Sequence, residues 1–207
     1  LSAGQFVYQD LAYSEAGLLG LLLEVPDYFI TGNKVEVDTI KQVGRFYPDY
    51  IAFGDYQLTP ACNGDFTYLG QKDAQISYTL RAYNQSSSPS VTRNYDLSRG
   101  YPVAPVNNFF NTVFAGTTAL TSRLLLDPYY QINNWKEGSY IVSPQFVGIN
   151  RLTNPDRADG PYLLSNNRAE YWIELMGIDG EKVKDISVPS SCSGNRCLLG
   201  DLGDMVC

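Results

Sequence analysis

Two glutamates and a tryptophan could form a site for glycoside hydrolysis. Glu170, Trp172 and Glu174 alternate with period two, so they share one face of an expected strand. Paired carboxylates hydrolyse glycosides without histidine or metal. Residues four apart on a strand lie about 13 Å from one another, whereas catalytic carboxylate pairs lie roughly 5.5 Å or 6.5–9.5 Å apart. We therefore expect a solvated outer face and no enzyme, unless an acid from another strand completes a pair.

A turn rich in acids is the candidate calcium site. Residues 154–160 read NPDRADG and place Asp156 and Asp159 close together. Ala158 stands where an EF-hand-like loop requires an oxygen ligand, and Asp-Gly is also ordinary turn chemistry. Asp156 and Asp159 are kept as calcium candidates, but we expect no metal and no cofactor.

Aromatic side chains could bind carbohydrate by stacking. Tyr129, Tyr130 and Trp135 fall in an expected loop, residues 127–138, and Trp172 lies on the strand face described above. The alternative is that the loop aromatics cover the end of the fold. Both interpretations are open at the level of sequence.

Composition excludes several classes of function. The chain has 207 residues and a net charge of −7, from 22 acidic and 15 basic residues. Without a basic cluster, binding to nucleic acid or to an anionic membrane surface is not expected. The absence of histidine excludes Ser–His and Cys–His nucleophiles and histidine-containing zinc sites. No apolar run reaches the ~18–20 residues of a membrane helix.

The four cysteines could form two disulfides or one four-thiolate metal site. They are Cys62, Cys192, Cys197 and Cys207. Zinc ribbons carry two close cysteine pairs, whereas only Cys192 and Cys197 are close here. The even count favours disulfides and an oxidising compartment. Cys192 with Cys197 and Cys62 with Cys207 is one of the three possible pairings, among which sequence cannot choose.

The dominant hydrophobic period is two, which is typical of half-buried strands. The apolar run at residues 16–25 predicts one or two buried strands, and residues 107–126 fit either strands or a short helix followed by a strand. Turns rich in Gly, Pro, Asn and Asp separate these segments. We predict an all-β fold, an immunoglobulin-like antiparallel β-sandwich with one partial and one complete unit. The clearest strands are expected at residues 34–39, 75–84, 139–147, 171–176 and 183–188.

A series of short motifs carries a family resemblance. In order they read VGRFYPDY (43–50), TPAC (59–62), FTYLGQ (66–71), ISYTLRAYN (76–84), TRNYD (92–96), WKEG (135–138), PDRADGPY (155–162) and GIDG (177–180). Upstream, FVYQDLAYSEAGLLGLLLEV looks like the hairpin that precedes them in the family. Over roughly residues 6–185 the chain resembles the C-terminal conserved region of MshQ, encoded with the mannose-sensitive haemagglutinin type IV pilus of Gram-negative bacteria.

The resemblance implies a location and a class, but no catalytic residues, because the biochemical activity of that region is unknown. It implies a non-catalytic, secreted β-domain at the cell surface of a Gram-negative bacterium, acting in adhesion or pilus assembly. Its partners would be pilus or other surface proteins and surface glycans. The alternatives are a carbohydrate-active enzyme and a purely structural stalk. Ile178 stands where the family has an aspartate, which weakens the calcium interpretation.

The same motifs suggest how the chain is divided. We expect an N-terminal strand unit at residues 1–43, the end of an immunoglobulin-like domain, and a main β-sandwich at residues 44–207. Gly44 and Pro48 would form the joint, with nearby aromatics wedged between the two parts; a ligand-binding role for these aromatics is the alternative. Because the chain begins at Leu1 without a signal-like segment, we expect a mature or excised piece of a longer protein.

Overall fold

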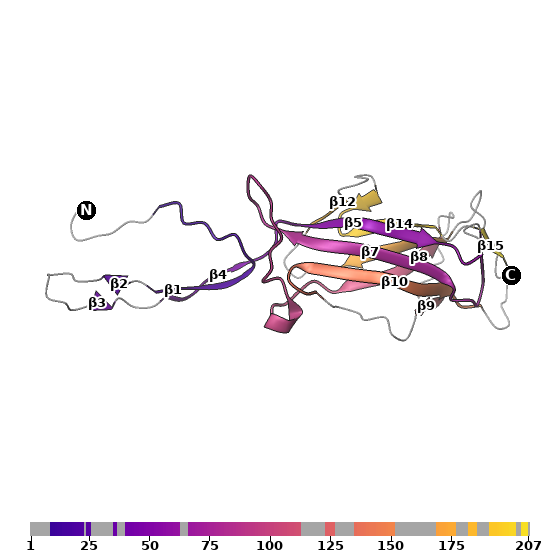
Figure 1. Cartoon of the computed structure of the whole chain (residues 1–207), viewed down its shortest axis with the longest axis horizontal. Coiled ribbons are helices and arrows are strands. Elements are labelled where there is room, and N and C mark those ends of the chain that lie inside the picture. The colour runs from indigo at the N-terminus through magenta and orange to yellow at the C-terminus, as the bar shows by residue number, and fades with distance from the viewer. Residues whose placement is uncertain are drawn as a thin grey trace.

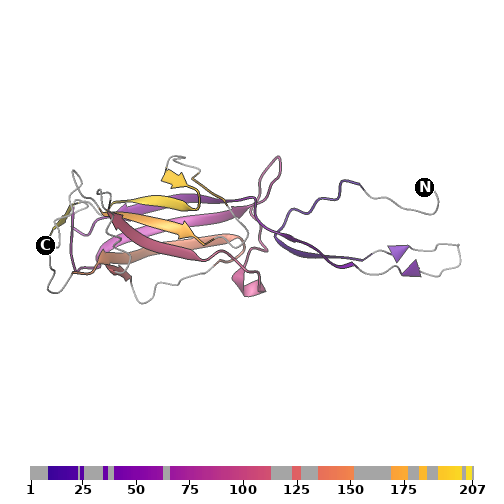
Figure 2. The same ribbon diagram turned by 180° about the vertical axis from the view of Figure 1, so that it is seen from behind.

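The structure is a computed structural model, and it places two packed β-sheets with a two-stranded arm extending from one end (Figures 1 and 2). The residues that it describes contain no α-helix, and they include a short 3-10 turn, η1 (Leu97–Arg99). The predicted all-β antiparallel sandwich is confirmed. The described residues are 9–22, 24–25, 35–36, 40–62, 66–112, 123–126, 135–151, 169–176, 182–185, 191–201 and 204–206.

In the described part of the chain, the larger sheet has five strands in the order β12-β5-β7-β10-β9. β12 runs parallel to β5, and the other neighbours are antiparallel. Bulges interrupt the pairing in β5 and β10, and Asp55 adopts a φ of 51° at the first of them. The bounds are β5 (Tyr50–Thr59), β7 (Ala74–Tyr83), β9 (Leu124–Leu126), β10 (Ser139–Ile149) and β12 (Lys182–Asp185).

The smaller sheet, as far as its residues are described, has four antiparallel strands in the order β13-β14-β11-β8. Its strand β8 (Val106–Thr112) settles part of the ambiguous segment, which is extended there and not helical. The other bounds are β11 (Ala169–Leu175), β13 (Cys192–Ser193) and β14 (Arg196–Asp201). A short parallel pair, β6 (Phe66–Tyr68) and β15 (Asp204–Val206), lies at the end of the molecule opposite the arm (Figure 1).

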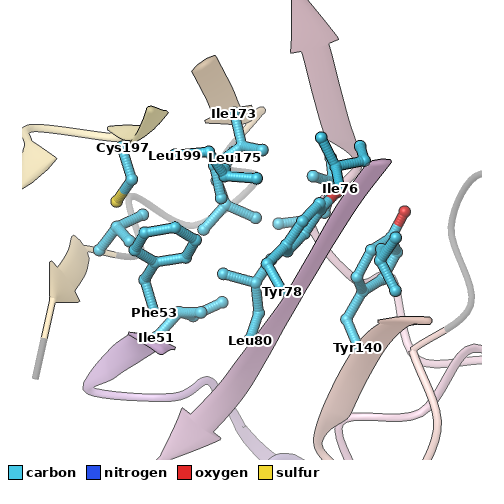
Figure 3. Close-up of a cluster of buried hydrophobic side chains, with 14 of the residues drawn as sticks. Ile51, Phe53, Ile76, Tyr78, Leu80, Tyr140, Ile173, Leu175, Cys197 and Leu199 are labelled. Carbon is cyan, nitrogen blue, oxygen red and sulfur yellow. The ribbon is translucent and has the colours of Figure 1, made fainter. Parts of the chain in front are cut away.

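The core lies between the sheets and consists of the inward-facing residues of both (Figure 3). Along β7 the predicted inward residues Ile76, Tyr78 and Leu80 are at most 1% exposed, because alternate side chains of a strand point to one face. The Tyr78 hydroxyl donates to the Asn108 side-chain oxygen over 2.9 Å, so the polar end of this buried ring is satisfied. Truncating such a core residue typically costs about 2–5 kcal/mol.

The arm is a β-ribbon made from the first strands of the chain. β1 (Gly17–Leu21) pairs with β4 (Ile40–Phe46), and farther out β2 (Glu24–Val25) pairs with β3 (Val35–Glu36). The sequence therefore predicted strands here correctly but was wrong about their burial. Leu18 is 58% exposed and Leu22 61%, because the described part of the ribbon has no second layer packed on it (Figure 1).

One disulfide closes the edge of the smaller sheet. Cys192 and Cys197 are joined with an S–S distance of 2.00 Å, linking β13 to β14. This agrees with the expected loop staple and fits an oxidising compartment. Cys62 forms no disulfide with any described residue, and Cys207 lies outside the described residues, so the pairing of these two stays a prediction.

The described part of the chain contains no helix long and apolar enough to cross a membrane.

Candidate functional site

The arm joins the sandwich at a short connection rich in aromatic residues. β4 contains Gly44 with a φ of 59° and continues to Phe46, beyond the domain boundary expected at residue 43. Pro48 is buried, and the Asp49 amide donates to the Tyr83 carbonyl over 2.8 Å as β5 begins. The chain therefore passes from arm to sandwich within three residues.

Aromatic contacts hold this connection in place. The ring of Phe46 lies 5.0 Å from that of Tyr13, and the Tyr101 hydroxyl donates to the Phe46 carbonyl over 2.9 Å. The Arg45 guanidinium lies 5.8 Å from the centre of the Tyr101 ring, a cation–π arrangement. Tyr47 is 54% exposed and is not part of this packing.

Polar contacts anchor the segment that enters the arm. The buried side chain of Asn84 donates to the Ser14 carbonyl over 2.9 Å, and its oxygen accepts from the Ser90 amide. The Glu15 carboxylate accepts a hydrogen bond from the backbone amide of Asn94 over 3.1 Å. Ser14 and Glu15 are thus tied to two loops at the end of the sandwich. Since Phe46 is held by Tyr101, both segments at the base of the arm are anchored to the sandwich.

Trp135 lies at the same end of the sandwich, where it packs inside. It is 1% exposed, its indole N–H donates to the Ala104 carbonyl over 2.9 Å, and its ring meets Tyr95 edge-on at 4.9 Å. No face of the ring is open for stacking on a sugar, so Trp135 covers the end of the fold, the second of the two interpretations. Tyr129 and Tyr130 lie outside the described residues.

Asp96 fixes the loop beside Trp135. The carboxylate is 2% exposed and accepts from the Ser98 hydroxyl (2.6 Å), the Ser98 amide (2.8 Å) and the Glu137 amide (2.9 Å). These hydrogen bonds, led by that of the Ser98 side chain, hold the pKa of Asp96 below its usual value despite burial. The loop that carries η1 is thereby locked to Glu137, whose φ is 47°.

A cleft of about 500 Å³ opens between the arm and the sandwich. Its lining combines two arginines with aromatic and small apolar residues, and the described lining residues include no acid. A cleft of about 350 Å³ shares Tyr13 and Arg45 with the first but also contains acids, Glu15 and Asp49. The larger cleft is lined by Tyr13, Ala16, Gly17, Leu18 and Arg45 from the arm side and by Asn94, Arg99, Gly100, Tyr101 and Pro102 from the sandwich.

The glutamates considered for glycoside hydrolysis are engaged in local contacts on β11. Glu170 accepts from the Trp172 indole N–H over 3.1 Å, and Glu174 pairs with Arg196 at 2.8 Å. Trp172 is half-buried on the outer face of the smaller sheet, whereas Ile173 is buried, as the alternation predicts. The expectation of a solvated face is therefore wrong at Glu170, which is only 6% exposed, whereas Trp172 and Glu174 are half-buried. Each carboxylate is bound to a neighbour.

The described residues contain no group of three or more His, Cys, Asp or Glu side chains placed to hold a metal ion. The calcium candidates Asp156 and Asp159 lie outside that part of the chain.

Sequence reasoning missed the residues that line the larger cleft. They come from three separate segments, around residues 13–18, at Arg45 and at residues 94–102. All three segments overlap motifs of the family resemblance, FVYQDLAYSEAGLLGLLLEV, VGRFYPDY and TRNYD, but nothing in their hydrophobic period indicates that they line one cleft. Only the docking of the arm on the sandwich brings them together.

Comparison with known proteins assigns the chain to a family. The family described as DUF6701, third domain, matches residues 15–202, so the chain belongs to that family. The description names no activity. Neither the curated proteins nor the solved structures include a match to this chain.

Proposed function

We propose that this member of the DUF6701 third-domain family is a non-catalytic module of an extracellular surface protein, acting in adhesion or in type IV pilus assembly. The arm is the element that contacts a neighbouring surface protein. The observation that carries the proposal is the exposure of Leu22 and Leu18 on a ribbon that extends from one end of the sandwich.

The arm has the features of an interaction element. Strands β1 and β4 form a two-stranded sheet among the described residues, so each presents an outer edge with backbone groups available for pairing. Such edges are templates for the addition of a strand from a partner. Exposed leucines beside them supply apolar area that a partner can bury.

Two further observations support the surface location. The Cys192–Cys197 disulfide fits an oxidising compartment. The ordered motifs from VGRFYPDY to GIDG resemble the MshQ region, which is found on pilus-associated proteins of Gram-negative bacteria. The resemblance supplies the pilus setting of the proposal.

Deletion of the coding segment for residues 15–202 from the chromosomal gene tests the proposal. We expect fewer pili per cell by electron microscopy, or fewer cells attached to a surface, and restoration of both by a plasmid copy of the intact gene. Normal pilus number together with normal attachment would contradict the proposal and would favour the stalk alternative.

A further inference from the structure

The larger cleft has the size and position of a ligand site. Its volume of about 500 Å³ falls within the roughly 300–1,000 Å³ of small-molecule pockets. One wall belongs to the arm and the other to loops at the end of the sandwich, so that a ligand would contact both. The contacts of Tyr101 with Phe46 and of Asn84 with Ser14 hold these walls in register before any ligand binds.

The charge of the cleft is opposite to that of the chain. Arg45 and Arg99 line it, and its described lining residues include no Asp or Glu, although the chain carries a net charge of −7. A guanidinium stays charged at all physiological pH values and matches a carboxylate with two parallel hydrogen bonds. The cleft is therefore suited to an anionic group.

The partners of Arg99 leave its positive charge only weakly compensated. Its Nη1 donates to the neutral side chain of Asn94 over 2.6 Å. The nearest carboxylate oxygen, on Asp96, is 3.9 Å from Nε, and that carboxylate already accepts three shorter hydrogen bonds from Ser98 and Glu137. The side chain is 53% exposed, so a ligand carboxylate can approach it.

The remaining walls suit a hydroxylated ring. The Tyr13 hydroxyl and the side-chain amide of Asn94, which lie 3.4 Å apart, can form hydrogen bonds with the hydroxyl groups of a ligand. The side chains of Leu18 and Pro102 supply apolar surface for the carbon face of a sugar.

From this geometry we propose that the cleft binds a carboxylate-bearing sugar, whose carboxylate is held by Arg45 and Arg99. The inference deepens the proposed adhesive function, on which its biological meaning rests. Its test uses only the purified chain. Absence of binding would contradict the sugar site, whereas a normal pilus count and normal attachment in the deletion strain would contradict the proposed function.

Calorimetric titration of the purified 207-residue chain provides the test. The probes are 3′-sialyllactose and digalacturonic acid, each compared with its neutral counterpart, lactose or the digalacturonic methyl ester. We expect at least one acidic sugar to bind about tenfold more tightly than its neutral counterpart. Absence of binding by both acidic sugars up to about 10 mM, or equal binding of the neutral compounds, would overturn the proposal.

Acetate and sulfate separate a sugar site from a general anion site. Binding of either ion as tightly as the acidic sugar would contradict the sugar part of the proposal. We expect both ions to bind more weakly, because they cannot use the walls formed by Tyr13, Asn94 and Leu18.

Substitutions locate the site. Arg45→Gln on the arm and Arg99→Gln on the sandwich should each weaken binding about tenfold. Arg93→Gln is the matched control, since Arg93 is an exposed arginine of the same loop that does not line the cleft. An equal loss in Arg93→Gln would contradict the assignment, and thermal unfolding of each variant establishes that it is folded.

Discussion

The hydroxyl of Tyr101 donates a hydrogen bond to the main-chain oxygen of Phe46 over 2.9 Å, and this contact ties the last residue of the arm to the sandwich. Tyr101 also packs against Tyr95 and lies under Arg45. The base of the arm is therefore built from the same residues that form the cleft.

Replacement of Tyr101 by Phe removes that hydrogen bond and keeps the ring contacts. We expect the chain to lose about 1 kcal/mol of unfolding free energy and the amides of β4 to exchange faster with solvent. Chemical denaturation and hydrogen exchange measure the two effects.

Tyr140→Phe is the matched control. The Tyr140 hydroxyl is buried and has no hydrogen-bond partner among the residues that the structure describes. Its removal should leave stability unchanged or slightly raised. Equal exchange of the β4 amides in Tyr101→Phe and in the unmodified chain would contradict the anchoring role of Tyr101.

The Asp96 carboxylate should make stability depend on pH on the acidic side. Its pKa is lower in the folded chain than the ordinary value of about 3.9 in the unfolded chain. The unfolded chain therefore binds more protons in that range, and the contribution of Asp96 is present above about pH 4 and is lost as the pH falls through the lowered pKa. Asp96→Asn should thus be less stable than the unmodified chain at pH 6, and the difference should shrink below pH 4.

Denaturant titrations at several pH values measure this difference. A stability gap between Asp96→Asn and the unmodified chain that stays constant from pH 6 to about pH 3 would contradict the assignment.

Gly148 lies against a neighbouring backbone. A Cβ at this position would lie 1.9 Å from the Gln71 carbonyl oxygen, and the backbone there cannot yield as a flexible side chain can. Gly148→Ala should therefore cost about 1–3 kcal/mol or more. Gly100→Ala is the comparison, since its Cβ would meet open space and only the φ of +74° opposes it, at a cost of about 1–2 kcal/mol. Urea denaturation of both variants tests the order, and a smaller loss in Gly148→Ala would contradict it.

The Cys192–Cys197 bond closes a short loop and should stabilise the chain modestly. With a sequence separation of 5, loop-closure entropy gives about 2 kcal/mol. Cys197→Ser should lose roughly that amount or more, because Cys197 is also buried in the core. Cys62→Ser is the control, and a similar loss there would indicate that Cys62 is also bonded. A non-reducing peptide map identifies the bonds directly.

The strand pattern could be predicted from sequence where a strand has one buried and one exposed face. Ile76 and Leu80 on β7, and Ile173 on β11, face the core because the side-chain period of a strand fixes their direction. The exposure of the leucines on the arm could not be predicted. A run such as GLLGL has the same composition whether or not a second layer of the fold covers it.

The cleft could not be predicted for a different reason. Arg45 and Arg99 are separated in sequence by the sandwich strands β5 and β7, and they line one cleft only because the base of the arm lies beside the loop that carries η1. For Trp135 the sequence left two interpretations open, and its burial under the end of the sandwich favours the covering role over sugar binding. Periodicity describes strands and carries no information about how loops pack on one another.

The most direct test of the central claim, that the chain works through its arm, compares two strains with single substitutions. One carries Leu22→Asp on the arm, outside the cleft, and the other carries Ile141→Asp at a residue of β10 that is 67% exposed. We predict that Leu22→Asp lowers the number of pili or of attached cells and that Ile141→Asp changes neither. Equal counts in the two strains, at matched levels of the protein, would contradict the claim.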